Sequence, residues 1–183
     1  MRVIAGSARG RKLQSVKGQK TRPTQDRVKE SLFAILADAI LIGDFLDLFA
    51  GSGSIGIEAL SRGAAKAVFV ERNKRAASTL RNNLTNTGFM EQSEIYLLDT
   101  TRALRRLAGE RRRFGCIFLD PPYNEGLIME TLAGIDPVLL SHETVVIAEH
   151  HRKEDIPETV GALVNVRQKV YGDTVLTFLK QSV

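Results

Sequence analysis

Four consecutive residues near the middle of the chain, Asp120-Pro121-Pro122-Tyr123, could act on an amino group attached to an aromatic ring. The nitrogen of such a group is a poor nucleophile because its lone pair is delocalised into the ring. Asp120 could accept one of its N–H hydrogens, and the carbonyl of Pro121, held by two conformationally fixed prolines, could accept the other. Tyr123 offers a face on which a nucleic-acid base could stack. Taken alone, the tetrapeptide is also typical of a rigid turn after a strand.

A glycine-rich stretch earlier in the chain, Asp47–Gly56 ("DLFAGSGSIG"), has the spacing of a nucleotide-binding loop. Gly51, Gly53 and Gly56 match the pattern G-x-G-x-x-G, which lets a ligand approach the backbone at the positive end of the following helix. Glu71 follows 20 residues after Gly51, at the end of the next predicted strand, where a carboxylate can accept both hydroxyls of a ribose. These features do not distinguish NAD from S-adenosylmethionine, since both ligands contain an adenosine ribose.

Two further acids favour S-adenosylmethionine. Asp47 lies inside a predicted strand, four residues before Gly51, where it would face the methionine end of that cofactor. Asp99 ends the third of the alternating strands, where it could accept from the adenine amino group. Together with Glu71 and Asp120, these acids occupy the sheet edge at which open α/β sheets bind ligands. Because the methyl group of this cofactor is carried by a sulfonium, its transfer requires no metal ion.

Apolar segments that alternate with helical patterns predict the sheet that would position these groups. Strands are expected at 45–49, 67–71, 94–98, 116–119 and 144–148. Their alternation with helices is typical of a parallel sheet that is covered on both faces. Segments 164–170 and 175–179 flank a turn and predict a closing hairpin, which places one antiparallel strand in the sheet. The predicted fold class is therefore α/β, with a mostly parallel sheet of seven strands.

Positive charge is concentrated at the start of the chain. The first 30 residues have a net charge of +7, against +5 for the whole chain. A basic arm on an otherwise near-neutral domain is typical of a nucleic-acid binder, although a soluble tail has the same composition. Segments 2–5 and 11–16 predict a small basic hairpin, and Thr24 or Asp26 could cap a helix that runs to about Ala39.

The length of 183 residues is enough for one domain, 1–183, with residues 1–25 as its basic N-terminal extension, a candidate RNA-binding segment. No apolar run approaches 18 residues and no secretory signal is present, which favours a cytoplasmic protein that does not enter a membrane. The one cysteine, Cys116, lies in an apolar run and is expected to be buried. No spacing typical of metal ligands is found, so we predict no metal site. A monomer is expected for this size.

Four blocks of sequence carry a resemblance to a known family over nearly the whole chain. They are "RVIAGSARGRKL" (Arg2–Leu13), "TRPTQDRVKESLF" (Thr21–Phe33), "DLFAGSGSIGIEALSRGA" (Asp47–Ala64) and "FLDPPY" (Phe118–Tyr123). The chain resembles the bacterial RsmD family, whose members methylate a guanine N2 of 16S ribosomal RNA in the small subunit. The last two blocks are shared with adenine-N6 DNA methyltransferases, whereas the N-terminal blocks point to ribosomal RNA.

This resemblance implies a class I, Rossmann-like methyltransferase fold and S-adenosyl-L-methionine as cofactor. The implied partner is 16S ribosomal RNA, in the small subunit or in an assembly intermediate. The residues expected to bind the cofactor are Asp47, Phe49, Ala50, Gly51, Ser52, Gly53, Gly56, Glu71, Arg72, Asp99 and Thr100. The residues expected to hold the guanine amino group are Asp120, Pro121, Pro122 and Tyr123. The residues expected to contact RNA are Arg9, Arg11, Lys12, Arg22, Thr24 and Arg27.

Three other functions would each explain part of the sequence. An adenine-N6 methyltransferase acting on DNA or another RNA would share the tetrapeptide, but 183 residues leave no room for a separate DNA-recognition domain. A non-catalytic RNA-binding or assembly module would explain the basic arm but not the glycine loop. An NAD dehydrogenase would need a substrate domain and an acid or base, and His142, His150 and His151 are expected at the surface or at a strand end.

Overall fold

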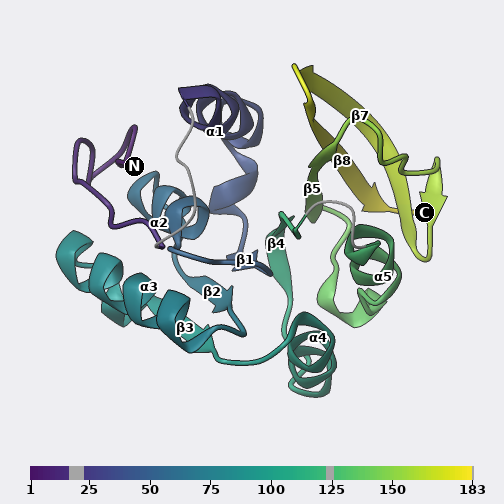
Figure 1. The fold of residues 1–183 in the computed structure, drawn as a ribbon. Coiled ribbons are helices and arrows are strands. Elements are labelled where there is room, and N and C mark those ends of the chain that lie inside the picture. Colours follow the sequence, from purple (N-terminus) through teal and green to yellow (C-terminus); the bar gives the residue numbers. More distant parts are fainter. Residues whose placement is uncertain (17–22, 123–125, 183) are drawn as a thin grey trace.

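An eight-stranded sheet with helices on both faces forms the body of the protein (Figure 1). The computed structural model describes residues 1–16, 23–122 and 126–182. The helices are α1 (Pro23–Leu36), α2 (Ser54–Ser61), α3 (Lys74–Thr87), α4 (Thr100–Gly109) and α5 (Leu127–Ala133). The strands are β1 (Asp44–Asp47), β2 (Ala67–Val70), β3 (Ser93–Tyr96), β4 (Phe114–Leu119), β5 (Val145–His151), β6 (Thr159–Val160), β7 (Leu163–Tyr171) and β8 (Thr174–Gln181).

The strand order is β3-β2-β1-β4-β5-β8-β7-β6. The strands β1 to β5 pair in parallel, and β8 pairs antiparallel with both β5 and β7. The predicted α/β class, the parallel run and the closing hairpin are therefore confirmed. The predicted sheet of seven strands with one antiparallel strand is wrong for the described residues, because an eighth strand, β6, also runs against the parallel strands, as β8 does. The additional strand, β6, contains only Thr159 and Val160, which is too short to show an apolar pattern.

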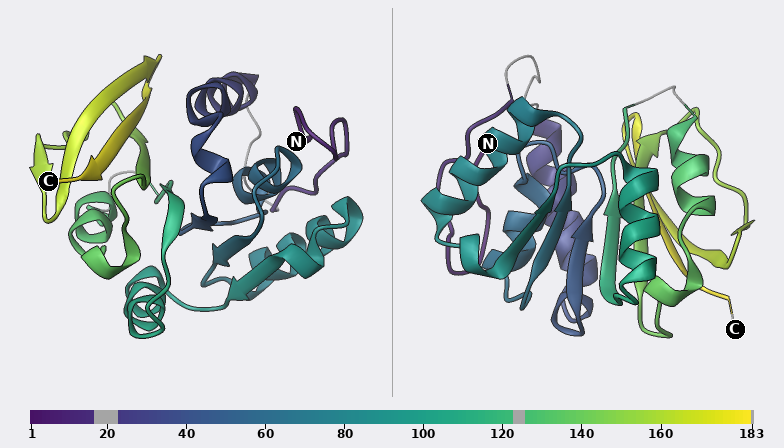
Figure 2. Two further views of the ribbon diagram at one scale, coloured as in Figure 1. Left: turned by 180° about the vertical axis from the view of Figure 1, so that it is seen from behind. Right: turned by 90° about the horizontal axis from the view of Figure 1, so that it is seen from below.

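Alternating side chains along the central strands divide the core into two layers. Phe45, Phe69 and Phe118 belong to the layer that packs against α1, α2 and α3. Their neighbours Leu46 and Ile117 belong to the opposite layer, which packs against α4 and α5. Both views in Figure 2 show these two sets of helices on opposite sides of the sheet. A residue's position in this alternation therefore decides which helices it faces.

Two helices that follow the sheet edge begin at side-chain caps. Asn73 accepts hydrogen bonds from the backbone N–H groups of Arg75 and Ala76 at the start of α3. Asp99 accepts one from the N–H of Arg102 at the start of α4. Such caps satisfy backbone donors that have no partner inside the helix. They also place the first turns of both helices at the carboxyl ends of β2 and β3.

The N-terminal segment turns back on itself, but it does not form the predicted pair of strands. One isolated antiparallel bridge, between Arg2 and Lys12, represents the expected hairpin. Val3, Ala8 and Leu13 are buried in the layer that contains α1 to α3. The segment lies beside α2 and α3 in Figure 1. Backbone hydrogen bonds join its two arms from Met1 to Leu13 and from Val3 to Arg11 and Gly10. The pairing goes no further because the N–H groups of the next residues, Ile4 and Ala5, donate to Glu58 of α2 instead. No helix in the described ranges is long and apolar enough to cross a membrane.

Candidate active site

The carboxyl ends of the parallel strands meet at one edge, where two adjoining cavities open. The larger has a volume of about 640 Å³, and three of the predicted acids line it: Glu71, Asp99 and Asp120. The smaller has a volume of about 150 Å³, and Asp47 and Asp120 line it. This edge includes the point between β1 and β4 where the strand order reverses, which is the usual ligand site of an open α/β sheet. The structure therefore brings together the four acids that were predicted to share an edge.

The glycine loop connects β1 to α2 and leaves no room for a side chain at Gly53 and Gly56. Gly53 has a φ of 82°, in the left-handed region that favours glycine, and it begins α2. A Cβ atom on Gly56 would lie 2.3 Å from Cε1 of Phe69 on β2. The N–H of Ala50 donates to the carbonyl of Val70 at 3.0 Å. The loop backbone is thus fixed in place by β2 on one side and by its own helix on the other.

Glu71 binds the glycine loop as well as lining the larger cavity. Its carboxylate accepts hydrogen bonds from the N–H of Gly51 at 2.9 Å and from the N–H of Asn73 at 2.6 Å. One side chain therefore joins the first glycine of the loop to the cap of α3. Each carboxylate oxygen retains a further lone pair. The contact of Glu71 with a ribose remains a prediction. The hydrogen bonds to Gly51 and Asn73 show that Glu71 also holds the loop in place, a role that was not predicted.

Asp99 and Thr100 hold the start of α4 against the sheet. The Asp99 carboxylate caps α4 and lies 3.3 Å from Nε of Arg102. The Thr100 hydroxyl donates to the carbonyl of Leu48 at 3.2 Å. Both residues line the larger cavity together with Phe49 and Arg72. These predicted cofactor residues thus surround one space, and their contacts with a cofactor remain predictions.

Asp47 is the most unusual carboxylate at this edge because it is buried and incompletely paired. One oxygen accepts from the N–H of Gly56 at 3.4 Å, whereas Oδ1 has no hydrogen-bond partner. Burial raises the pKa of Asp47 to about 7, against the effect of N–H groups of Gly56 and Phe49; the charges of Asp120 and Glu71 raise it further. An unpaired buried carboxylate oxygen is costly in a folded protein. A cationic or N–H donating group in the smaller cavity would relieve that cost.

These features fit S-adenosylmethionine. The smaller cavity is lined by the unpaired Asp47 and by Ala50, Gly51 and Ser52 of the glycine loop, and the larger by Glu71 and other polar groups. An unpaired carboxylate suits the ammonium group of the methionine end. The backbone N–H of Gly51, however, is already bonded to Glu71. The fit of this site to the cofactor therefore depends more on the shape of the loop and on the carboxylates of Asp47 and Glu71 than on free backbone N–H groups.

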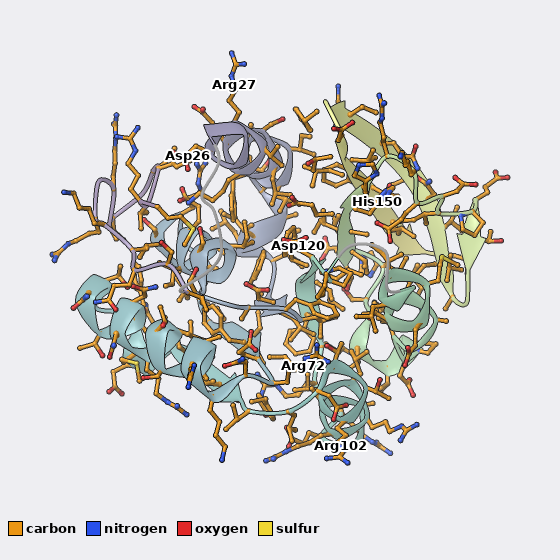
Figure 3. All side chains as sticks on the ribbon, viewed as in Figure 1. Asp26, Arg27, Arg72, Arg102, Asp120 and His150 are labelled. Carbon is orange, nitrogen blue, oxygen red and sulfur yellow. The ribbon has the colours of Figure 1, made fainter. Side chains whose placement is uncertain are left out.

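Asp120, Pro121 and Pro122 follow β4 directly and line the larger cavity. The Asp120 side chain is exposed to the cleft, and it has no hydrogen bond or ion pair with another residue of the described ranges. The pKa of Asp120 is raised because the surrounding protein removes water from it, although the solvent in the cleft moderates this effect. Figure 3 shows Asp120 near the middle of the molecule, at the end of β4. The predicted Tyr123 lies outside the described residues.

Sequence reasoning missed a fifth acid at this edge, Glu149 of β5. It lines both cavities together with Asp120. Burial raises the pKa of Glu149, and the charge of Asp120 raises it further. The available signal was its position directly after the predicted strand 144–148, which is the same position that identified the other acids.

A buried ion cluster behind the smaller cavity was also missed. Nζ of Lys29 on α1 lies 3.3 Å from Oε2 of Glu58 on α2, and both side chains are almost fully buried. Lys29 also donates to the carbonyl of Arg2 at 2.9 Å and to the hydroxyl of Ser54 at 3.3 Å. Burial lowers the pKa of Lys29, while the adjacent Glu58 opposes that effect. This cluster joins α1, the N-terminal segment and the first residue of α2.

The N-terminal segment is fixed to the same helices through its backbone. Glu58 accepts from the N–H groups of Ile4 at 2.8 Å and Ala5 at 3.0 Å. Asn83 on α3 accepts from the N–H of Gln14 at 2.8 Å and donates to the carbonyl of Ser52 at 2.8 Å. Asn83 thereby links the N-terminal segment to the glycine loop. The predicted basic extension is therefore part of the packed structure over residues 1–16.

The predicted RNA-contacting residues are distributed over two elements. Arg9, Arg11 and Lys12 are exposed on the N-terminal segment. Arg27 is exposed on α1, and in Figure 3 it points away from the body of the protein. Thr24 belongs to α1, and its side chain is not described. Arg22 lies outside the described residues. Their contacts with RNA remain predictions.

Cys116 and the three histidines line neither of the two cavities. Cys116 is buried as expected, and burial raises the pKa of its thiol to about 12. His150 lies next to the last residue of β5, in agreement with the expected strand-end position, but it is buried, and its Nε2 lies 2.8 Å from the hydroxyl of Thr177. His142 is exposed and His151 is half-buried. Among the described residues, no group of three or more His, Cys, Asp or Glu side chains could hold a metal ion.

Comparison with known proteins identifies the family. A family model described as "conserved hypothetical protein 95" matches residues 1–180. The chain belongs to this family. It is 44% identical over 182 residues to YlbH of Bacillus subtilis, a candidate rRNA methyltransferase, with 99% of each chain covered. It is 35% identical over 173 residues to ribosomal RNA small subunit methyltransferase D of Escherichia coli K12, which covers 94% of this chain and 85% of the relative. The predicted resemblance to the RsmD family is thereby confirmed.

Solved structures of related and of more distant proteins have the same fold. A candidate methyltransferase of Escherichia coli, yhhF, matches with a TM-score of 0.85 and 31% identity, over 99% of this chain and 97% of that chain. A candidate methyltransferase solved with S-adenosylhomocysteine, SMU.776, matches with a TM-score of 0.69 and 14% identity, over 87% of this chain and 50% of that chain. The second likeness extends the fold to a distant protein. The predicted class I methyltransferase fold is confirmed.

Proposed function

We propose that this protein transfers a methyl group from S-adenosyl-L-methionine to the exocyclic N2 amino group of a guanine in 16S ribosomal RNA of the small ribosomal subunit. The observation that carries the proposal is the position of Asp120-Pro121-Pro122 at the same cavity as the cofactor-binding candidates Glu71 and Asp99. Curated relatives that match most of the chain are named as rRNA methyltransferases, one of them for the small subunit. The RNA substrate is inferred from these names and from the basic N-terminal segment.

The cofactor site is assigned to the glycine loop and the acids around it. S-adenosylmethionine, when bound, supplies an electrophilic methyl group on a positively charged sulfur. Asp47 would bind the ammonium group of the methionine end through its unpaired Oδ1. Glu71 would accept from the ribose hydroxyls, and Asp99 from the adenine amino group. Arg72 and Thr100 complete the wall of the larger cavity.

The target amino group is assigned to Asp120 and to the carbonyl of Pro121. Together they would accept both N2 hydrogens and draw the nitrogen lone pair out of conjugation with the ring. The nitrogen then attacks the methyl carbon, a C–N bond forms, and the C–S bond breaks with its electron pair left on sulfur. The nitrogen now carries one hydrogen too many, and Asp120 accepts it as a proton before releasing it to water. A raised pKa makes Asp120 a stronger base for that step.

RNA would approach from the side of the N-terminal segment and α1. Arg9, Arg11 and Lys12 are assigned to phosphate contacts, as is Arg27 on α1. Arg22, Thr24 and the stacking residue Tyr123 keep the roles that the sequence predicts for them. We assign the protein to the cytoplasm, where ribosomal subunits assemble, and we expect it to act as a monomer on the small subunit or an assembly intermediate.

The test uses radiolabelled S-adenosylmethionine and three substrates: small subunits that lack the modification, matched naked 16S RNA, and duplex DNA. We expect N2-methylguanosine in 16S RNA, identified by mass spectrometry of the nucleosides. The preferred RNA form would define the assembly stage. Label recovered from DNA as N6-methyladenine would replace this function by the adenine-N6 alternative. No label in any substrate, with the cofactor still bound, would contradict both.

A further inference from the structure

Glu149 and Asp120 occupy equivalent positions on neighbouring parallel strands. Leu119 of β4 is in register with Ala148 of β5, so the next residue on each strand is an acid. Leu119 and Ala148 face the layer of α4 and α5. Since side chains alternate along a strand, Asp120 and Glu149 both point to the opposite side. Both line the smaller and the larger cavity.

No polar contact within the described protein accounts for a glutamate at position 149. No hydrogen bond or ion pair joins it to another residue within 1–16, 23–122 and 126–182. The charge of Asp120, which has the same sign, raises the pKa of Glu149 and so gives it no compensation. Lys29, which also lines the smaller cavity, is paired with Glu58 instead. A carboxylate in this setting destabilises the fold, and a ligand with N–H donors would satisfy it.

The number of acceptors at this point matches the number of donors on one edge of guanine. Guanine presents three N–H hydrogens there, two on N2 and one on N1. Asp120 and the carbonyl of Pro121 account for the two N2 hydrogens under the proposed function. The third donor, N1–H, lies next to N2 and needs an acceptor beside Asp120. Strands in a sheet lie about 4.8 Å apart, which places Glu149 at a suitable distance for that role.

We propose that Glu149 accepts the N1–H of the target guanine and thereby makes the site specific for guanine over bases whose N1 carries no hydrogen. This inference rests on the proposed function and identifies a specificity-determining residue for it. Adenine and 2-aminopurine present a lone pair at N1, so they offer no hydrogen that a carboxylate oxygen of Glu149 could accept. A site that is built to pair a donor rejects an analogue without it, because its own buried group is then left unpaired.

The decisive substrate is a small subunit whose 16S RNA carries 2-aminopurine at the target nucleotide, introduced by ligation of RNA fragments. This base keeps the N2 amino group that accepts the methyl and changes N1 from a donor to an acceptor. We expect the unmodified protein to favour guanine over 2-aminopurine by at least about 100-fold in kcat/KM. Differences in the intrinsic reactivity of the two bases cancel when the same ratio is compared between protein variants.

The matched variant is Glu149→Gln, whose amide can donate to the N1 lone pair of 2-aminopurine. We expect its ratio of guanine to 2-aminopurine to fall at least about tenfold below that of the unmodified protein. Glu143→Gln makes the same change just before the opposite end of β5, at an exposed residue, and should leave the ratio unchanged. Glu149→Asp keeps the charge and should keep the preference for guanine at a lower rate. A purely structural role for Glu149 would lower both rates together.

Two results would overturn the inference. An unchanged ratio in Glu149→Gln, with guanine still methylated, would show that Glu149 does not contact N1. Weaker binding of S-adenosylmethionine but not of S-adenosylhomocysteine by Glu149→Gln, again with an unchanged ratio, would assign the carboxylate to the cofactor's positive charge. Failure of the unmodified protein to label the guanine-containing subunit is a separate result, because it would contradict the proposed function itself.

Discussion

The two halves of the candidate site differ in how fully their polar groups are paired. Around β1, β2 and β3, Glu71 and Asp99 are bonded to backbone N–H groups of their own edge. Around β4 and β5, Asp120 and Glu149 have no such partner among the residues described. Asp47 lies at the boundary, with one oxygen bonded and the other without a partner.

In the first half the acids are already paired within the protein, whereas in the second half we expect a ligand to supply the missing hydrogen-bond donors. Hydrogen bonds within the half assigned to the cofactor hold its walls in place in the unliganded chain, which would reduce the ordering cost of binding. Carboxylates in the other half are held close together without donors, and a base that brings N–H groups satisfies them. Under the proposed function, the cost of leaving these carboxylates unpaired would be relieved only by a substrate whose N–H groups match them.

The largest effect is expected for Asp120→Ala, which removes an acceptor from the unpaired half only. We expect kcat for methyl transfer to fall by about 10²–10⁴, while the Kd of the cofactor changes by less than about tenfold. Single-turnover assays and calorimetry would measure the two quantities. Asp155→Ala, at an exposed acid, is the control. A large loss of cofactor affinity in Asp120→Ala would remove the distinction between the halves.

Asp47→Asn tests the boundary residue through stability. Because burial raises the pKa of Asp47 to about 7, the folded chain holds a proton that the unfolded chain releases above about pH 4. Ionisation of this carboxyl therefore destabilises the fold increasingly between those two pH values. We expect Asn to raise the free energy of unfolding by about 1–4 kcal/mol at pH 8, by less at pH 5, and to weaken cofactor binding. Urea unfolding at both pH values is the measurement, and an equal gain at both would contradict the raised pKa.

Glu71→Ala should have a smaller effect, confined to the paired half. Loss of two backbone hydrogen bonds to a charged group, together with the ribose contact, is expected to weaken cofactor binding by about 10–100-fold. Calorimetry would measure this, with Glu91→Ala at an exposed acid as the control. Methyl transfer at saturating cofactor should be affected much less. Unchanged cofactor affinity would contradict the assignment.

The smallest effect is expected for basic residues of the N-terminal segment, which belong to neither half of the candidate site. Replacement of Arg9, Arg11 and Lys12 by Gln should weaken RNA binding by about tenfold at moderate salt and reduce its salt dependence by about 1–3 in log–log slope. Cofactor affinity should not change. Replacement of Lys153, Arg167 and Lys169, which are exposed on and before the antiparallel hairpin, provides a control of equal charge. An equal slope in both triple variants would mean that the N-terminal segment does not bind phosphates specifically.

Local patterns were sufficient to predict the sheet and the position of most of the site. Apolar runs identified the five parallel strands, and acids at their ends identified the edge where Glu71, Asp99 and Asp120 now line one cavity. The same rule would have identified Glu149 had it been applied to the fifth strand. The signal was present in the sequence, because Glu149 directly follows the apolar run of that strand.

Contacts between distant segments could not be predicted in this way. Glu58 accepts from Ile4 across 54 positions, and Asn83 accepts from Gln14 across 69. Within its own helix, Glu58 has the spacing of an ordinary surface partner for Arg62, four residues later. Only the folded arrangement reveals that this acid is buried beneath the N-terminal segment. The charge of that segment was visible in the sequence, but its attachment to α2 and α3 was not.

Attachment of the N-terminal segment to α2 and α3 also sets an order of events during synthesis. The segment leaves the ribosome before Glu58 and Asn83, the residues that will hold it, have been translated. At about 5–20 residues per second, the 69 positions from Gln14 to Asn83 take roughly 3–14 seconds to translate. Docking of the segment must therefore come after the first half of the sheet has emerged. In the finished protein the same segment should reopen more readily than the core, so its amide hydrogens would exchange with solvent earlier than those of β1 or β4.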